Sequence, residues 1–250
     1  MKAIILAAGA GKRLGRLGQR TPKCMIKLQN KPIIEHQINA LKLNRIDDIS
    51  VVVGYQADRV KKKLRNKNVK FYLNKDYETT GLLESLFKAK NELNDETILV
   101  YGDIIFKPDI VKSLLRCKKD FCLAIEKGKY FDENPQLIEK YKGMKIIKGY
   151  TKVYISKGFV KKISKSLSHD ETSGKYIGVA RFSRKGIQII KARIFKLIKS
   201  GEIKKYPSPS YLLMDFIKKG FKIYPIYTSS KNYAEIDTME DLENAKKKFN

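Results

Sequence analysis

The residues best suited to chemistry lie near the N-terminus, where glycines and basic side chains follow a short apolar run. Ile4, Ile5 and Leu6 are typical of a buried strand. The small residues that follow let a ligand approach the backbone, and glycines allow free N–H groups to turn inward. Such a loop with basic side chains suits a polyphosphate. The residues predicted to line it are Leu6, Ala7, Ala8, Gly9, Ala10, Gly11, Lys12, Arg13 and Lys23.

The glycine spacing excludes two common phosphate-binding motifs. A Walker A loop requires Gly-Lys followed by Ser or Thr at a set spacing, and this is missing. The glycines fall at positions 9, 11 and 15, one residue too long for the G-x-G-x-x-G fingerprint, and no acidic residue follows at a second strand end. From the glycines alone, a phosphate-binding loop and a flexible surface loop both remain open.

Two carboxylates further along the chain are candidates for metal ligation. Asp103 lies just after a predicted strand over 97–101, and Asp237 lies just before a predicted helix over 239–249. A carboxylate at the same sheet edge as a phosphate-binding loop is a natural Mg²⁺ ligand. Each aspartate has a structural alternative, as a turn residue or a helix cap. Thr238 can cap the last helix equally well, which would free Asp237 for a metal.

Strands and helices that alternate along the first half of the chain position these residues. Such alternation implies right-handed βαβ units and a mostly parallel sheet, with ligands at the carboxyl ends of its strands. Gly54 with Tyr55, and Gly102 with Asp103, fall at that edge beside the glycine loop. The predicted elements are helices over 32–43, 55–65 and 81–93 and strands over 49–54, 69–73 and 97–101. The sequence therefore predicts an α/β fold, with a Rossmann-like, mostly parallel mixed sheet flanked by helices.

The second half of the chain is richer in short strands. They are predicted over 121–126, 145–147, 151–155, 159–165, 176–182 and 222–226, and helices are predicted over 184–200, 210–219 and 239–249. We expect a single domain over 1–250, in which the β-rich segment at about 127–183 forms an acceptor-binding subregion.

The formal net charge of +27 limits the classes of partner. Such a charge indicates binding to nucleic acid, a membrane surface or anionic metabolites, or else a surface solvated by lysine. No helix-turn-helix, RNP or zinc pattern supports the alternative of a basic nucleic-acid-binding protein, and no apolar run is long enough to span a membrane. Three cysteines are too few for a disulfide framework, so we expect reduced thiols in a cytoplasmic protein without nucleic-acid or membrane partners.

Four stretches together resemble the signature of the nucleotidyltransferases, which join an NTP to a phosphorylated acceptor. The first is Leu-Ala-Ala-Gly-x-Gly-x-Arg-Leu at 6–14, followed by Thr-Pro-Lys at 21–23. The others are Gly102-Asp103, Tyr176-Ile177-Gly178, and Glu-Ile-Asp-Thr-Met-Glu-Asp-Leu at 235–242. The resemblance covers essentially the full chain and implies the fold of the nucleotide-diphospho-sugar transferases.

The resemblance also implies roles for individual residues. Asp103 and Asp237 would hold Mg²⁺, the expected cofactor. Lys23 would contact the reacting phosphates, and Arg13 the outer phosphates of the NTP. The lysine that binds the acceptor phosphate corresponds to Lys165, although the Glu and Pro that flank it in the family are absent here.

Within that family, the length and the Ile-Ser-Lys segment are most similar to cytidylyltransferases that activate phosphocholine and related small phosphates. The resemblance implies transfer of CMP from CTP for capsule modification, with UTP, dTTP or GTP and a sugar 1-phosphate as the alternative. Nucleotide-binding residues beyond the glycine loop are expected to be Gly54, Tyr55, Thr80, Gly81, Ser85, Gly102 and Asp103. Acceptor-binding residues are expected to be Lys165, Tyr176, Gly178, Tyr233 and Glu235.

The identity of the acceptor stays open at this point. A choline headgroup favours an aromatic cage, best with Trp, and the chain contains no Trp. Tyr233 is the nearest substitute, with Tyr130, Phe131 and Tyr141 as further candidates. A phosphorylated amino-acid amide, such as the phosphoglutamine of capsular phosphoramidate synthesis, fits a polar pocket better. Phosphocholine, phosphoglutamine and a sugar 1-phosphate all remain possible, and the oligomeric state is not determined.

Overall fold

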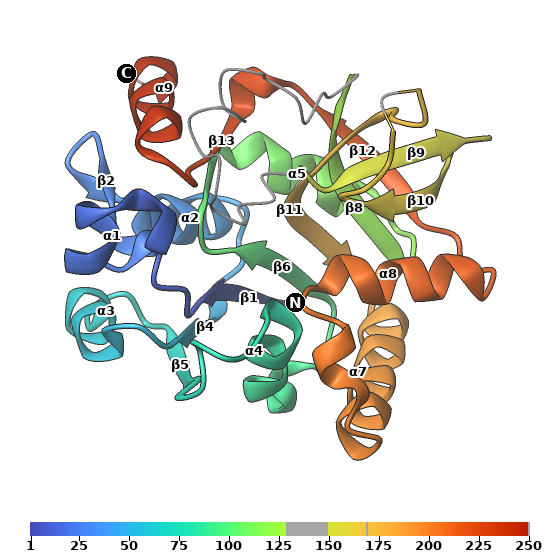
Figure 1. Ribbon diagram of the computed structural model, residues 1–250, viewed down its shortest axis with the longest axis horizontal. Helices are drawn as coiled ribbons and strands as arrows, with labels where there is room; N and C mark the ends of the chain where they lie inside the picture. The colour runs from blue at the N-terminus through green and yellow to red at the C-terminus, as the bar shows by residue number, and fades with distance from the viewer. Residues whose placement is uncertain (129–149, 169, 250) are drawn as a thin grey trace.

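The computed structural model describes residues 1–128, 150–168 and 170–249. The main strands are β1 (Lys2–Ala7), β4 (Asp48–Val53), β5 (Lys70–Leu73), β6 (Thr97–Tyr101), β8 (Phe121–Lys127), β9 (Lys152–Ser156), β10 (Phe159–Ser164), β11 (Gly174–Phe182) and β12 (Tyr224–Thr228). They form one nine-stranded mixed sheet in the order β10-β9-β11-β6-β1-β4-β5, to which β8 adds beside β11 and β12 beside β8. Figure 1 shows helices on both sides of this sheet, as the sequence predicts.

The parallel half of the sheet is built around β1. This strand lies between β4 and β6, in parallel register with both, and β5 extends the sheet beyond β4. Its side chains alternate between two core clusters, with Ile4 and Leu6 on one face and Ala3 and Ile5 on the other. Both faces are covered by helices, which is why the strand is apolar throughout.

Within the part of the chain that the structure describes, six helices form the two covering layers. One layer is α4 (Leu82–Lys88), α7 (Arg184–Lys199) and α8 (Pro209–Lys218), and the other is α2 (Ile33–Lys42), α3 (Ala57–Leu64) and α5 (Pro108–Arg116). Each presents an apolar stripe to the sheet. The predicted helix over 81–93 is shorter than expected, because α4 ends at Lys88 and a 3₁₀ turn follows. The predictions did not include α5, although Pro108 at its first turn and its apolar stripe are a readable signal.

The second half of the sheet is mostly antiparallel. Strand β11 pairs antiparallel with β6, β8 and β9, and β9 and β10 form a hairpin. The register of β11 against β8 shifts between Tyr176 and Ala180, where Gly178 adopts φ +77°. A Cβ at Gly178 would stand 2.5 Å from Ile104 Cδ1, so only glycine fits this bulge. The strand predicted over 145–147 lies outside the described residues.

Small elements join the glycine loop to the C-terminal part of the chain. They are α1 (Arg16–Arg20), β2 (Lys27–Leu28), β3 (Lys31–Pro32), β7 (Ile104–Phe106), β13 (Tyr233–Glu235) and α9 (Met239–Phe249). Leu14, Ile105, Ile236 and Leu242 share a third apolar cluster among them. In Figure 1 the C-terminal helix α9 lies on the same side of the molecule as α1 and β2. This cluster packs the segment that follows β1 against the C-terminal segment of the chain.

The cysteines correct one expectation. Cys117 at the end of α5 and Cys122 in β8 form a disulfide with a Cα–Cα distance of 6.7 Å, so the expectation of reduced thiols is wrong for this pair. A short turn joins the two elements, and it brings the cysteines together without any wider disulfide framework. Cys24 is buried and unpaired, and burial raises the pKa of its thiol to about 12. Among the described residues, no helix has both the length and the apolar character needed to cross a membrane.

Candidate active site

The glycine loop leaves β1 at Ala7 and folds back on itself. Gly11 adopts φ +66°, and its carbonyl accepts the N–H of Leu14 at 2.9 Å. Gly18 packs so closely behind the loop that a Cβ there would lie 2.1 Å from the Gly11 carbonyl oxygen. Gly9 differs, because a Cβ at this position would have no other atom within 4 Å. The loop is therefore packed on one side and open at Gly9.

Lys23 joins the two carboxylates that the sequence nominates as metal ligands. Its Nζ lies 2.8 Å from Asp103 Oδ2 and also contacts Asp237 Oδ1. Arg13 reaches the same oxygen of Asp237, with its Nη2 at 2.7 Å. Only 12% of the Lys23 side chain is exposed, compared with 39% for Arg13. The four residues predicted to be catalytic therefore meet at one point.

A short antiparallel ladder brings the two aspartates together. Glu235 of β13 pairs with Ile104 of β7, and the Ile236 N–H donates to the Asp103 carbonyl at 3.0 Å. Asp103 and Asp237 therefore stand on adjacent backbones at the end of this ladder.

Thr238 caps the helix that follows. The Asp241 N–H donates to the Thr238 hydroxyl at 3.2 Å, and the Thr238 N–H donates to the Asp241 carboxylate at 2.7 Å. This reciprocal pair is a capping box. The interpretation that Thr238 can release Asp237 from capping is confirmed by this geometry.

Glu235 extends the pair to a group of three carboxylates, which we call the carboxylate cluster. One oxygen each from Asp103, Glu235 and Asp237 lie within 4.8 Å of one another. Asp103 Oδ1 is buried and has no hydrogen-bond partner within the described part of the chain. An unpaired buried oxygen is costly, and clustered carboxylate oxygens are the donors that hard divalent cations prefer. The residues present therefore fit a divalent cation, with Glu235 as a donor that the sequence analysis assigned to the acceptor.

Charge fixes the ionisation of this group at neutral pH. Burial by itself lowers the pKa of Lys23, but the Asp103 and Asp237 carboxylates outweigh burial and raise the pKa above its ordinary value. Burial acts to raise the pKa of Asp237, and the Lys23 and Arg13 cations reverse the shift and lower it. Lys165 lowers the pKa of Asp237 as well, so its ammonium lies within electrostatic reach of the cluster.

Gln37 was not predicted as a site residue, but it holds the turn that carries Asp103. This fully buried amide of α2 donates to the carbonyls of Tyr101, at 2.8 Å, and Ile104, at 2.7 Å. Both carbonyls flank the Asp103 turn. The signal in the sequence was an amide in the middle of an otherwise apolar helix face. Gly102 completes the turn, because a Cβ there would lie 2.6 Å from the Leu6 carbonyl oxygen.

The predicted base-binding glycine, Gly54, lies at the end of β4. A Cβ on Gly54 would lie 2.8 Å from the Ala8 carbonyl oxygen and 2.7 Å from Tyr77 Cβ. The Tyr55 N–H donates to the same Ala8 carbonyl at 3.0 Å. The backbone after β4 is therefore hydrogen-bonded to the glycine loop, and the two predicted nucleotide segments touch.

Asn74 organises the remaining predicted nucleotide residues. Its fully buried side chain donates to Thr80 Oγ1 at 2.9 Å and to Ser85 Oγ at 3.0 Å. Gly81 caps α4, because the Glu84 carboxylate accepts its N–H at 2.9 Å. The sequence analysis missed Asn74, which follows a predicted strand as Asp103 does.

The predicted acceptor residues are divided by the fold. Glu235 lies in the carboxylate cluster, and Lys175 of β11 contacts it with Nζ at 2.8 Å from Oε2. The Tyr233 hydroxyl donates to the carboxylate of Glu126 at the end of β8. Neither Lys175 nor Glu126 was predicted. Lys175 did leave a signal, because it is a charged residue in a strand that is buried along its whole length.

Tyr176 and Gly178 have structural surroundings. The Tyr176 ring is 3% exposed and packs edge-on against Tyr101, with the ring centroids 5.9 Å apart. Gly178 forms the bulge described above. The aromatic candidates Tyr130, Phe131 and Tyr141 lie outside the described residues.

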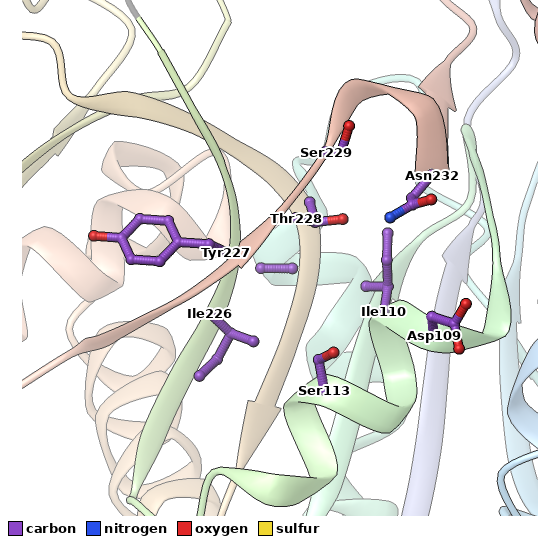
Figure 2. A pocket seen from close by; sticks show the side chains of 9 residues that line it. Asp109, Ile110, Ser113, Ile226, Tyr227, Thr228, Ser229 and Asn232 are labelled. Atoms are coloured by element: carbon purple, nitrogen blue, oxygen red, sulfur yellow. The ribbon is translucent and has the colours of Figure 1, made fainter.

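A pocket of about 280 Å³ lies apart from this cluster, between α5 and β12. Figure 2 shows Asp109, Ser113 and Asn232 around it, with Tyr227 turned away to one side. None of the predicted site residues lines it. Its place in the fold therefore does not alter the assignment of the site.

Solved structures share this fold. The CTP:phosphocholine cytidylyltransferase of Streptococcus pneumoniae matches with a TM-score of 0.78 at 24% identity, covering 100% of this chain and 99% of that one. The inositol-1-phosphate CTP transferase of T. maritima matches with a TM-score of 0.77 at 22% identity, covering 99% and 94%. The predicted fold class is confirmed: the chain has the α/β fold of nucleotidyltransferases.

Sequence comparison then gives the family. Residues 3–192 match the MobA-like NTP transferase domain. The chain is 30% identical to CTP:phosphoglutamine cytidylyltransferase of Campylobacter jejuni subsp. jejuni, over 97% of this chain and 98% of that protein. It is 39% identical to the choline-phosphate cytidylyltransferase of Streptococcus pneumoniae over 43% of this chain and 47% of that protein. This protein belongs to the MobA-like NTP transferase family, and the predicted resemblance to nucleotidyltransferases is confirmed.

Proposed function

We propose that the enzyme transfers CMP from CTP to a small phosphorylated acceptor of the phosphoglutamine or phosphocholine type and releases pyrophosphate. The observation that carries this proposal is the meeting of Lys23, Asp103 and Asp237 beside the glycine loop. The relatives support CTP as the donor, because the proteins compared above are named for CTP or for cytidylyl transfer.

The reaction is a displacement at the α-phosphorus of CTP. An oxygen of the acceptor phosphate forms the new P–O bond, while the bond between the α-phosphorus and the bridging oxygen breaks. Pyrophosphate leaves with the electron pair of that bond. No general base is required, because a phosphate dianion is already a nucleophile at neutral pH. The contribution of the protein is therefore positioning and stabilisation of charge.

The basic residues have distinct parts in this proposal. Lys23 stabilises charge on the α-phosphate, since its buried ammonium is held beside the cluster by two carboxylates. Arg13, which is more exposed, and the N–H groups of the glycine loop stabilise the departing pyrophosphate. Lys165 binds the acceptor phosphate, in agreement with its electrostatic reach to Asp237.

The carboxylates have a complementary part. Asp103, Asp237 and Glu235 would hold Mg²⁺, which supplies charge neutralisation for the phosphate oxygens when bound. Lys23 contacts two of these carboxylates, which supports a double role for its ammonium: it would orient the metal donors and stabilise the substrate phosphates.

A grid of substrates tests the proposal. Pyrophosphate release would be measured with Mg²⁺ for CTP, UTP, dTTP, GTP and ATP, each against phosphocholine, phosphoethanolamine, L-glutamine phosphate and common sugar 1-phosphates. We expect release with CTP and one small phosphorylated acceptor. Release only with UTP, dTTP or GTP and a sugar 1-phosphate would overturn the cytidylyl assignment. If no pair of substrates released pyrophosphate and no NTP bound to the protein, the proposal as a whole would be overturned.

A further inference from the structure

A buried ammonium group lies against two tyrosine rings next to the carboxylate cluster. Lys175 is 5% exposed, and its Nζ is 3.8 Å from the ring centroid of Tyr150 and 5.5 Å from that of Tyr233. The same Nζ is 2.8 Å from Glu235, a member of the cluster. Lys175 therefore contacts the carboxylate cluster through Glu235, and its ammonium lies against two aromatic rings.

A second cation reinforces this arrangement. Lys248 of α9 places its Nζ 5.8 Å from the ring centroid of Tyr233 and donates to the Tyr233 carbonyl at 3.0 Å. Burial lowers the pKa of Lys248; the Glu126 carboxylate opposes this shift, and the Lys175 ammonium adds to it. Tyr233 is thus approached by two ammonium groups of the chain itself, while its hydroxyl is bound to Glu126.

These contacts change what the aromatic residues can recognise. A quaternary ammonium binds through the faces of aromatic rings, and here ammonium groups of the protein already contact those faces. A further cation would also be repelled by Lys175 and Lys248 at short range. A carboxylate would instead be attracted by the Lys175 ammonium, which has three N–H donors and forms an ion pair with Glu235.

We infer that Lys175 determines acceptor specificity: it rejects trimethylammonium headgroups and selects phosphorylated acceptors that carry a carboxylate. This inference rests on the proposed function, since it names the acceptor class of the same site. It explains how a chain without Trp can carry tyrosines at this place and yet not build a choline cage. The carboxylate of the acceptor would then be bound by the ammonium that also orients Glu235.

Matched acceptors test the inference on the full-length protein. O-phospho-L-serine and phosphoethanolamine differ only by a carboxylate, and phosphocholine differs from phosphoethanolamine only by three methyl groups. With CTP and Mg²⁺, we expect kcat/KM to be about tenfold or more higher for O-phospho-L-serine than for phosphoethanolamine, as a hydrogen bond between charged groups allows. Phosphocholine should be the poorest of the three.

Variants of Lys175 test the assignment to this residue. Lys175→Met should reduce the preference for O-phospho-L-serine to less than about threefold and raise the relative rate with phosphocholine, while Lys175→Arg should keep the preference. Lys90→Met is the matched control, because the Lys90 ammonium also contacts two rings, Phe87 at 4.8 Å and Phe195 at 5.9 Å, away from the cluster. It should leave the preference unchanged.

The outcomes separate this inference from the proposed function. Efficient use of phosphocholine by the unmodified enzyme, or equal use of the three acceptors, would overturn the role of Lys175 and leave cytidylyl transfer intact. An unchanged preference in a folded Lys175→Met enzyme would overturn it as well. If that variant does not fold, the comparison of acceptors with the unmodified enzyme still decides. No pyrophosphate release with any acceptor in the wider grid would instead remove the proposed function.

Discussion

The proposed nucleotide side and the proposed acceptor side of this site are built by different means. On the proposed nucleotide side the chain uses glycines and backbone groups: Gly54 and Gly102 pack against the backbone of β1 and of the glycine loop, and Gly9 leaves the loop open. Around Lys175 and Glu235 it uses charged side chains on β8, β11, β13 and α9. Backbone sites tolerate little change in shape, whereas a side-chain site can change its ligand through one substitution. If the proposed assignment holds, one scaffold could keep its nucleotide and vary its acceptor.

Lys23, Asp103 and Asp237 form the boundary between the two sides. A substitution at this boundary should have the largest effect on turnover. Lys23→Ala removes the cation that joins Asp103 to Asp237, and we expect kcat to fall by about 10²–10³-fold with both substrates saturating. Steady-state pyrophosphate release measures this. The control is Lys205→Ala, which breaks an exposed pair with Glu202 and should leave kcat unchanged. Near-normal turnover of Lys23→Ala would contradict the proposed mechanism.

Two glycine substitutions test whether the nucleotide side depends on the backbone. Gly54→Ala places a Cβ 2.7 Å from Tyr77 Cβ, and the free energy of unfolding should fall by about 1–3 kcal/mol because the core must shift. Gly9→Ala meets no atom within 4 Å, so stability should be kept while CTP affinity falls. Urea unfolding and CTP titration measure the two effects. Unchanged CTP affinity in Gly9→Ala would mean that the ligand does not approach the loop there.

Substitution of Gln37 tests whether the function of the boundary residues depends on a rigid turn at Asp103. Gln37→Leu leaves the Tyr101 and Ile104 carbonyls without their donor, which should cost about 1–3 kcal/mol of stability. We also expect the Mg²⁺ concentration for half-maximal rate to rise about tenfold, since the turn that carries Asp103, a proposed Mg²⁺ ligand, loses its hydrogen bonds from Gln37.

The control for Gln37 is another amide with the same kind of contacts. Asn44, just beyond the C-terminal end of α2, donates to the carbonyls of Ala40, at 2.8 Å, and Pro108, at 3.0 Å. Asn44→Leu should lower stability without changing the Mg²⁺ dependence. An equal change in Mg²⁺ dependence in both variants would show that Gln37 acts through general stability alone.

The smallest expected effect is the pH dependence of the stability that Asp237, a residue of this boundary, contributes. The pKa of Asp237 is lowered in the folded protein, so its stabilising contribution is present above the ordinary carboxylate pKa of about 4 and is lost as pH falls through the folded value. The stability difference between the unmodified protein and Asp237→Asn should be about 1 kcal/mol at pH 7 and should shrink below pH 4. Urea unfolding at several pH values measures it, and a difference that grows toward low pH would contradict the assigned direction.

The sequence by itself determined the parallel half of the sheet and the residues of its loop. Apolar runs such as Ile4 to Leu6 are readable because a strand buried on both faces must be apolar along its length. Asp103 could be nominated because it follows a predicted strand, and ligands of parallel sheets bind at the carboxyl ends of the strands. The roles of Lys23, Arg13 and Asp237 came from the resemblance to the nucleotidyltransferases.

Only the tertiary structure decided how the carboxylate cluster and the acceptor side are assembled. Glu235 and Asp103 meet through a ladder of three residues on each strand, which is too short to leave a periodic pattern in the sequence. The proposed role of Lys175 depends on its contacts with Tyr150, Tyr233 and Glu235, which lie in other segments of the chain. The physical reason is that a charge or an amide acts on whatever lies within a few ångströms of it, and that neighbourhood is set by chain pairing between distant segments.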